Sequence, residues 1–263
     1  MDSRVDVILP AGGRVRGRFA AQLGTEVKAL IELGGQTLLA ATLDTLRATG
    51  RVQRSVVIGP KEVAEHRAAR GADAVLLEAG SGPGNILRGL EWLQEANSGH
   101  HPHRVLIIGT DLPFLTPQAV TGFLDACPAE ADISLPVMRR EALQARFPAA
   151  RRGYVHLRDG GWTMGSASLV SPAALVSNRI YVEHAFAGRK IMLALAWRLG
   201  PAFLLRFAFR QLTVTDIQRR CEQMLACACC AVLDCAPELA FDIDRLRDYR
   251  YAVAHLATRS PAT

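Results

Sequence analysis

The chain has 263 residues, of which 49% are apolar, and a formal net charge of +6. This length and composition predict one large α/β domain, or one domain with added helices. Aromatic residues make up only 6% and no basic run is interleaved with them, so nothing favours nucleic acid as a partner. The positive charge fits a polyanionic small molecule, and it equally fits solvated arginines on exposed helices.

Targeting and membrane signals are weak. The start, MDSRVDVILPAGG, has too short an apolar run for a signal peptide, so we expect a cytoplasmic protein. The longest apolar stretch covers residues 191–209, but Arg198, Arg206 and the Gly200-Pro201 pair interrupt it. These interruptions predict two packed helices and no membrane span, with an amphipathic surface helix as the alternative.

The first half of the chain alternates apolar runs with amphipathic stretches. We expect strands over 5–10, 30–33, 54–59, 74–78, 104–109 and 132–137. A long loop over 11–28 and helices over 37–49, 61–70, 84–96 and from about 117 are expected between them. Strand and helix in alternation predict a largely parallel sheet between two helix layers.

The second half is less regular, and the boundary near residue 138 is soft. A strand and a turn are expected over 154–161, and strands over 163–170, 228–234 and 239–243. Several helices are expected over 172–227, and a closing helix over 245–257. The predicted fold class is therefore α/β, with three layers, a mostly parallel mixed sheet and a helical elaboration in the C-terminal half.

Residues 104–113, RVLIIGTDLP, form the most informative segment. Asp111 directly follows a buried strand, and in open α/β sheets ligands bind at the carboxyl ends of the strands. The alternative is that Asp111 only caps a turn or the next helix.

Two glycine loops are expected near the same edge. In the first, Gly12 and Gly13 allow close approach of a ligand, while Arg14, Arg16, Arg18 and Lys28 offer donors to phosphate. The alternative is a flexible loop with solvated arginines.

The second loop, EAGSGPGN over 78–85, opens a helix whose amides can face an anion. It contains Gly82, Gly84 and Asn85. It imitates a dinucleotide-binding motif, but Leu87 occupies the third glycine position, so that interpretation is weak.

An acidic pair, Asp242 and Asp244, lies just before the closing helix. We expect the two carboxylates to point to opposite faces of an extended segment, one reaching the site and the other, preferably Asp244, capping the helix. One of them together with Asp111 would form a hard oxygen site suited to Mg²⁺ with a phosphate ligand.

The six cysteines do not form a recognisable zinc motif, because no CxxC pair occurs and no histidine lies near the cluster over 227–235. We expect a core strand with reduced thiols there. The histidines of SGHHPH, 98–103, are expected in a solvated loop.

Together these motifs resemble the MobA-like NTP transferase family, which comprises nucleotidyltransferases of the GT-A-like fold, near the molybdenum-cofactor guanylyl- and cytidylyltransferases. The resemblance rests on LPAGGR with the later Lys28, on IIGTDLP and on FDIDRLRD, in this order along the chain. It implies one nucleotidyltransferase domain over 1–263, with a nucleotide-binding half (1–137) and an acceptor-binding half (138–263).

The resemblance further implies an Mg²⁺-dependent transfer of NMP from an NTP to a small phosphorylated or hydroxyl acceptor, with release of pyrophosphate. Ala11, Gly12, Gly13, Arg14, Gly82, Gly84 and Asn85 would bind the nucleotide. Lys28, Arg18 and Asp111 would be catalytic, Asp111 with Asp242 or Asp244 would hold the metal, and Lys190 would contact the acceptor. The base, the acceptor and the oligomeric state stay open.

The sequence departs from the family pattern at several points. Pro10 lies within the opening motif, the loop between Arg14 and Lys28 is long, Arg245 follows the acidic pair, and Gly165-Ser166 stands where glycine-asparagine is frequent. These departures leave the acceptor open. Three alternatives therefore remain: a glycosyltransferase of the same fold, a dinucleotide oxidoreductase and a catalytically silent nucleotide-binding protein.

Overall fold

The computed structural model describes residues 4–96, 104–148, 150, 152–179 and 200–257. A central sheet of nine strands runs through both halves of the chain, in the order β5-β4-β1-β6-β10-β7-β9-β8, with β11 paired to β7. Its strands are β1 (Val5–Pro10), β4 (Val52–Gly59), β5 (Ala74–Leu77), β6 (Val105–Ile108), β7 (Ile133–Arg139), β8 (Val155–Leu157), β9 (Gly160–Met164), β10 (Ala167–Val170) and β11 (Cys229–Val232).

The predicted mixed sheet is confirmed. Strands β5, β4, β1 and β6 pair in parallel, whereas β10 is antiparallel to both β6 and β7. A separate two-stranded sheet pairs β2 (Glu32–Leu33) with β3 (Gln36–Thr37). Parallel strands covered on both faces must be apolar along their length, as VILP and VLII are.

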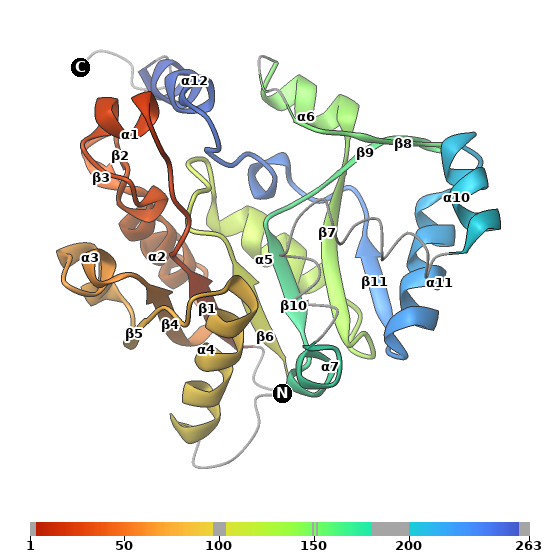
Figure 1. Cartoon of the computed structure of the whole chain (residues 1–263), viewed down its shortest axis with the longest axis horizontal. Coiled ribbons are helices and arrows are strands. Elements are labelled where there is room, and N and C mark those ends of the chain that lie inside the picture. The colour runs from red at the N-terminus through yellow and green to blue at the C-terminus, as the bar shows by residue number, and fades with distance from the viewer. Residues whose placement is uncertain (1–3, 97–103, 149, 151, 180–199, 258–263) are drawn as a thin grey trace.

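Helices cover both faces of the sheet (Figure 1). They are α1 (Arg18–Leu23), α2 (Leu38–Ala48), α3 (Lys61–Ala64), α4 (Gly82–Ala96), α5 (Pro117–Ala126), α6 (Arg140–Arg146), α7 (Pro172–Ser177), α10 (Pro201–Ala208), α11 (Val214–Leu225) and α12 (Leu246–Ala257), with 3₁₀ turns η1 (Lys28–Leu30), η2 (Arg67–Gly71) and η3 (Pro237–Leu239).

Two apolar clusters form the two interfaces of this three-layer fold. One packs α2 and α5 against one face of β1 and β6, through residues such as Leu9, Leu39 and Phe123. The other packs α4 and α7 against the opposite face, through residues such as Ile8 and Leu90. Successive residues of β1, Ile8 and Leu9, therefore belong to different clusters, as the alternation of side chains along a strand requires.

Four of the expected elements differ from the structure. The loop expected over 11–28 contains α1, and the helix expected over 61–70 is divided into α3 and η2. The strand expected over 163–170 is two strands, β9 and β10, interrupted at Gly165-Ser166. The strand expected over 239–243 is an irregular segment after η3, because its backbone bonds to loops rather than to a neighbouring strand.

Among the described residues, no helix is both long and apolar enough to cross a membrane. Cys229 and Cys230 lie in β11 with free thiols, as expected, but they are half-buried rather than in the core, because β11 pairs with β7 on one side only. Burial raises the pKa of the Cys229 thiol to about 12. The histidine loop falls outside the described residues.

Candidate active site

The two glycine loops leave the sheet at neighbouring strand ends. The amide of Ala11 donates to the carbonyl of Ile58 at 2.7 Å, and the amide of Glu78 donates to Gly59 at 2.8 Å. A Cβ atom built on Gly12 would lie only 2.6 Å from the Glu78 carboxylate and 3.6 Å from the Asn85 amide nitrogen. The structure therefore brings the two loops into contact, and a side chain at position 12 would displace Glu78.

The second loop is held in shape by its own polar groups. The Asn85 side-chain oxygen accepts from the amide of Ala79 at 2.6 Å, and the Ser81 hydroxyl accepts from Gly84 at 3.1 Å. Gly82 is the first residue of α4, so the positive end of a 15-residue helix lies beside the loop. Such helix ends attract anions.

Lys28 joins the first loop to two carboxylates. Its amide donates to Gly13 at 2.9 Å, and a Cβ on Gly13 would approach the Lys28 stem to 3.3 Å. Its ammonium donates to Asp111 Oδ2 at 3.1 Å and to Asp244 Oδ1 at 2.5 Å. Three predicted site residues from distant parts of the chain thus converge on one point, next to the Gly12-Gly13 backbone.

The charges of this cluster reinforce one another. Burial lowers the pKa of Lys28, but the nearby Asp111 and Asp244 outweigh it, so that the pKa is raised above its usual value. Burial likewise opposes ionisation of Asp244, yet its hydrogen bond and charge interaction with Lys28 hold its pKa below the usual value. Lys28 and Asp244 are therefore both charged at neutral pH.

Asp242 lies beside this cluster with partners of its own. One carboxylate oxygen pairs with the guanidinium of Arg152, and the other accepts from the Ser166 hydroxyl at 3.2 Å. Burial raises the pKa of Asp242; Arg152 opposes this shift, whereas the negative charges of Asp111 and Asp244 add to it. Of the acidic pair, Asp242 therefore ionises less readily than Asp244.

The break between β9 and β10 places Ser166. Its amide donates to the Leu239 carbonyl at 2.8 Å, and its own carbonyl accepts from Gly109 at 2.8 Å. A Cβ on Gly165 would lie 2.9 Å from that Leu239 carbonyl oxygen, so only glycine lets the strands and the 239–243 segment approach so closely.

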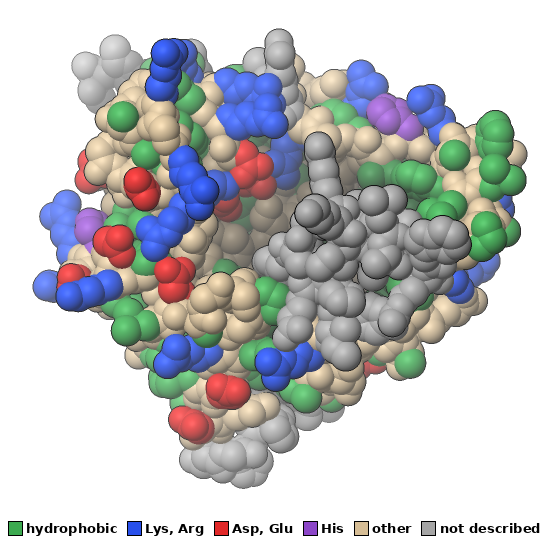
Figure 2. Space-filling model, viewed as in Figure 1, with side chains coloured by type: hydrophobic (Ala, Val, Ile, Leu, Met, Phe, Trp, Pro, Cys, Tyr) green, Lys and Arg blue, Asp and Glu red, His purple; other side chains and the backbone are tan. Residues whose placement is uncertain are grey.

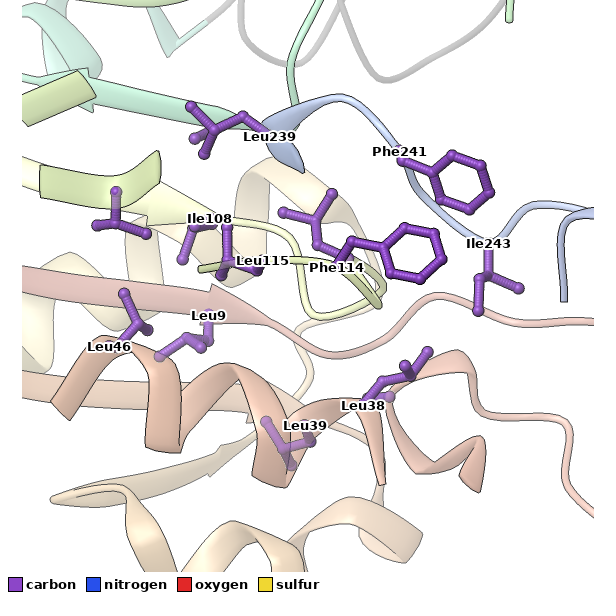
Figure 3. Close-up of a cluster of buried hydrophobic side chains, with 14 of the residues drawn as sticks. Leu9, Leu38, Leu39, Leu46, Ile108, Phe114, Leu115, Leu239, Phe241 and Ile243 are labelled. Atoms are coloured by element: carbon purple, nitrogen blue, oxygen red, sulfur yellow. The ribbon is translucent and has the colours of Figure 1, made fainter. Parts of the chain in front are cut away.

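Apolar anchors position the acidic pair. Phe241 and Ile243 are buried, and in Figure 3 both point into the apolar cluster that also holds Phe114. Phe241 packs against the rings of Phe114 and Phe147 at centroid distances of 4.9 and 5.0 Å. Asp242 and Asp244 alternate with these two anchors, so their side chains point away from the apolar cluster.

This arrangement corrects two expectations. Residues two positions apart on an extended segment share a face, so the expectation that Asp242 and Asp244 point to opposite faces was wrong. Asp244 does not cap the closing helix, since its carboxylate pairs with Lys28 and α12 begins at Leu246. The first turn is instead closed by Asp248, whose side chain accepts from the amide of Arg245 at 2.8 Å.

The basic residues of the first loop are distributed unevenly. Arg14 pairs with Glu78 at 3.2 Å and approaches Glu62 at 3.8 Å. Arg16 and Arg18 are exposed, and within the described part of the chain no contact joins them to the aspartates. Lys190 lies outside the described residues.

Three residues of this site were not singled out from the sequence. Glu78 ends a predicted strand, and the strand-end argument used for Asp111 could have found it. Ser166 was noted only as part of a departure from the family pattern. Arg152 lies in an irregular segment with no pattern, so only the tertiary structure identifies it as the partner of Asp242.

Figure 2 shows a hollow near the middle of this face, with acidic and basic side chains gathered above and to the left of it. A polar cleft at the carboxyl edge of a parallel sheet, with two glycine loops and converging carboxylates, is suited to a phosphate-bearing ligand.

Comparison with known proteins agrees with this geometry. The model of the MobA-like NTP transferase domain matches residues 7–181. A hypothetical transferase from Thermus thermophilus is 30% identical, with a TM-score of 0.79 over 94% of this chain and 99% of that one.

A second solved structure, 4-diphosphocytidyl-2C-methyl-D-erythritol synthase from Anaerococcus prevotii, shares the fold at 13% identity. Its TM-score is 0.62, over 98% of this chain and all of that one. A nucleotidyl transferase from Methanothermobacter thermautotrophicus gives 0.58 at 17% identity, over 98% and 99% of the two chains. The family model covers well over half of the chain, and with it the GT-A-like fold is established. The chain therefore belongs to the MobA-like NTP transferase family and is a nucleotidyltransferase.

Proposed function

We propose that this protein transfers an NMP group from an NTP to a small acceptor in an Mg²⁺-dependent reaction that releases pyrophosphate. The observation that carries the proposal is the convergence of Lys28, Asp111 and Asp244 beside the Gly12-Gly13 backbone. Transfer of NMP groups is the general activity of the family; the metal, the roles of individual residues and the acceptor class are our proposals. We place the reaction in the cytoplasm.

In this proposal the nucleotide lies along the two glycine loops. Backbone groups at Ala11 and Gly12 contact the base, and the 78–85 loop and the start of α4 offer amides to the nucleotide. Arg14 and Lys28 neutralise the charge of the triphosphate. To do so, Arg14 must give up its ion pair with Glu78 and bind a phosphate oxygen instead. Arg18 is exposed at the start of α1, and its long side chain would also contact the triphosphate.

The residues fit a magnesium ion that arrives with its nucleotide. Asp111 and Asp244 already present oxygens to one cation, the Lys28 ammonium. Among the described residues no three His, Cys, Asp or Glu side chains form a metal site by themselves. This agrees with Mg²⁺, which is commonly held by one or two carboxylates while phosphates and water complete the shell. Bound there, the ion would neutralise phosphate charge.

We assign Asp244 rather than Asp242 as the partner of Asp111. Both oxygens of Asp242 are already engaged, by Arg152 and Ser166. Asp244 shares a single cation with Asp111. Asp242 then acts as a positioning residue that holds Arg152 and the β9–β10 break in place.

The chemical step requires no covalent intermediate with the protein. An oxygen of the acceptor attacks the α-phosphorus in line, the new P–O bond forms, and the bond to the departing pyrophosphate breaks. Lys28 stabilises the charge that develops on the leaving group, and the loops hold the reactants in line. If the attacking group is a hydroxyl, its proton passes to water.

Asp111→Asn tests the proposal, with Asp125→Asn as a matched control on the exposed face of α5. Each protein is screened by thermal shift with ATP, CTP, GTP and UTP plus Mg²⁺, and pyrophosphate release is measured. A nucleotide at 100 times its dissociation constant stabilises a protein by about 2.7 kcal/mol. We expect Asp111→Asn to lose metal-dependent turnover and to keep the wild-type melting temperature without ligand.

Near-normal turnover in Asp111→Asn would show that the metal site is misplaced. Transfer of a sugar without pyrophosphate release would overturn the reaction itself. The assignment of Asp244 is tested by the Mg²⁺ affinity of Asp244→Asn and Asp242→Asn, and an equal loss in both would contradict it.

A further inference from the structure

A cavity of about 300 Å³ opens next to the acidic pair. Its lining comes from two segments, around Arg152-Gly153 and from Phe241 to Asp248, both distinct from the two glycine loops. Asp242 and Asp244 form part of its wall, so an occupant would lie directly against the carboxylates of the proposed reaction centre.

Most of the charges in this wall are already matched. Arg152 pairs with Asp242, Asp244 pairs with Lys28, and Arg247 contacts Asp248 at 3.4 Å. These pairs leave the cavity polar but contribute no net positive charge to an incoming ligand.

Arg245 is the exception in this wall. Its backbone amide donates to Asp248, but within the described residues its guanidinium has neither a hydrogen bond nor an ion pair. It lies near enough to Asp244 to favour the ionised carboxylate. An arginine that lines a cavity without a protein partner presents forked donors that match the oxygens of a phosphate or a carboxylate.

We propose that this cavity is the acceptor subsite and that Arg245 binds an anionic group, phosphate or carboxylate, on the acceptor. The assignment rests on the proposed nucleotidyl transfer. Its position fits, because an acceptor held there has its nucleophilic oxygen beside Asp244, while the nucleotide approaches from the glycine loops. Its volume is at the lower limit for ligand sites, which favours a small charged metabolite over a polymer.

The inference also explains a departure from the family pattern. The residue after the acidic pair is Arg245 here, and this residue lines the cavity beside Asp244. A change at this position would alter the acceptor without touching the nucleotide loops, because the two sets of residues come from different segments.

The test is calorimetric titration of the full chain with glycerol 3-phosphate, glycerate and glycerol at fixed ionic strength, without nucleotide. Wild type is compared with Arg245→Gln and with Arg250→Gln. Arg250 lies in α12, the helix that begins directly after Arg245, outside the cavity lining and with an exposed contact to Gln22, so its removal matches the change in net charge. We expect at least one of the two anions to bind wild type and Arg250→Gln with equal affinity. The same anion should bind Arg245→Gln about 10- to 100-fold less tightly, and glycerol should bind none of the three proteins.

Preference for glycerol 3-phosphate identifies a phosphorylated acceptor, and preference for glycerate identifies a carboxylate. The inference is overturned if neither anion binds wild type, or if Arg245→Gln and Arg250→Gln bind alike. Failure of the proposed function is separate, since it appears as absence of Mg²⁺-dependent stabilisation by any NTP in wild type.

Discussion

The two halves of the molecule build their part of the site in different ways. In the N-terminal half, Gly12, Glu78 and Asp111 each follow the end of a parallel strand, so the sheet itself brings them to one edge. In the C-terminal half, Arg152, Ser166 and Asp244 lie in irregular segments or strand breaks. Packing positions these three, through Phe241, Phe147 and the close approach at Gly165.

The two halves of the site are held by different interactions, so different substitutions should disturb them. Strand-end loops inherit their position from a hydrogen-bonded ladder that runs through the whole sheet. Segments held by side-chain packing lose their position when a single anchor is removed, because the backbone has few regular hydrogen bonds to hold it. Substitutions of equal cost to stability should therefore have unequal effects on activity in the two halves.

Phe147→Ala should have the largest effect on stability. Phe147 is fully buried and stacks on Phe114 at 4.9 Å, and truncation of such a residue costs about 3–5 kcal/mol. Phe123→Ala, at an equally buried position in α5, is the matched variant in the N-terminal half.

Urea denaturation should give similar losses for Phe147→Ala and Phe123→Ala, while kcat of the folded protein falls more in Phe147→Ala. Equal kcat values in the two variants would contradict the proposed difference between the two halves. If either variant does not fold, the Phe→Leu pair serves the same purpose.

Lys28→Ala should lower the rate by about 10²–10³, the usual loss for one preorganised charge stabiliser. Lys28 also separates two carboxylates, so the variant should lose stability as well, because Asp111 and Asp244 are then left without their shared cation. Lys61→Ala, which removes an exposed i,i+4 pair on α3, is the control and should leave turnover unchanged. Wild-type turnover in Lys28→Ala would show that the ion pairs of Lys28 serve only the structure and not the reaction.

Gly165→Ala should cost about 1–3 kcal/mol, because the added methyl meets a backbone oxygen at 2.9 Å and two packed side chains. Gly122→Ala is the matched change in the N-terminal half. Gly122 lies inside helix α5, and a Cβ built on it would meet no other atom within 4 Å, so alanine should stabilise the protein by about 0.5–1 kcal/mol. Thermal unfolding of both variants checks the opposite signs, and a neutral Gly165→Ala would show that the β9–β10 break is tolerant.

Chelation should have the smallest effect, namely none. The cysteines of β11 and its neighbourhood have free thiols, and burial raises the pKa values of Cys229 and Cys230. Within the described residues, no group of three His, Cys, Asp or Glu side chains is placed to hold a metal ion. Elemental analysis should find no stoichiometric zinc, and EDTA should leave the melting temperature unchanged. One tightly bound zinc per chain would contradict this prediction.

The layers of the fold, and the part of the candidate site that lies at the ends of parallel strands, could be predicted from the sequence. Buried parallel strands have continuous apolar runs, so VDVILP and VLII could be identified, and the residues after them could be placed at one edge. The cap of α2 at Thr37 was also predictable, because a helix cap depends only on residues three positions apart in the sequence.

The arrangement of the site residues in the C-terminal half could not be predicted from the sequence. That Arg152 pairs with Asp242, and that Asp244 pairs with Lys28 instead of capping α12, both depend on contacts between segments far apart in the chain. Such contacts leave no periodic trace. The acidic pair could be identified in the sequence, but the direction in which it points could not. That direction is set by the burial of Phe241 and Ile243, which depends on the aromatic cluster formed by the rest of the molecule.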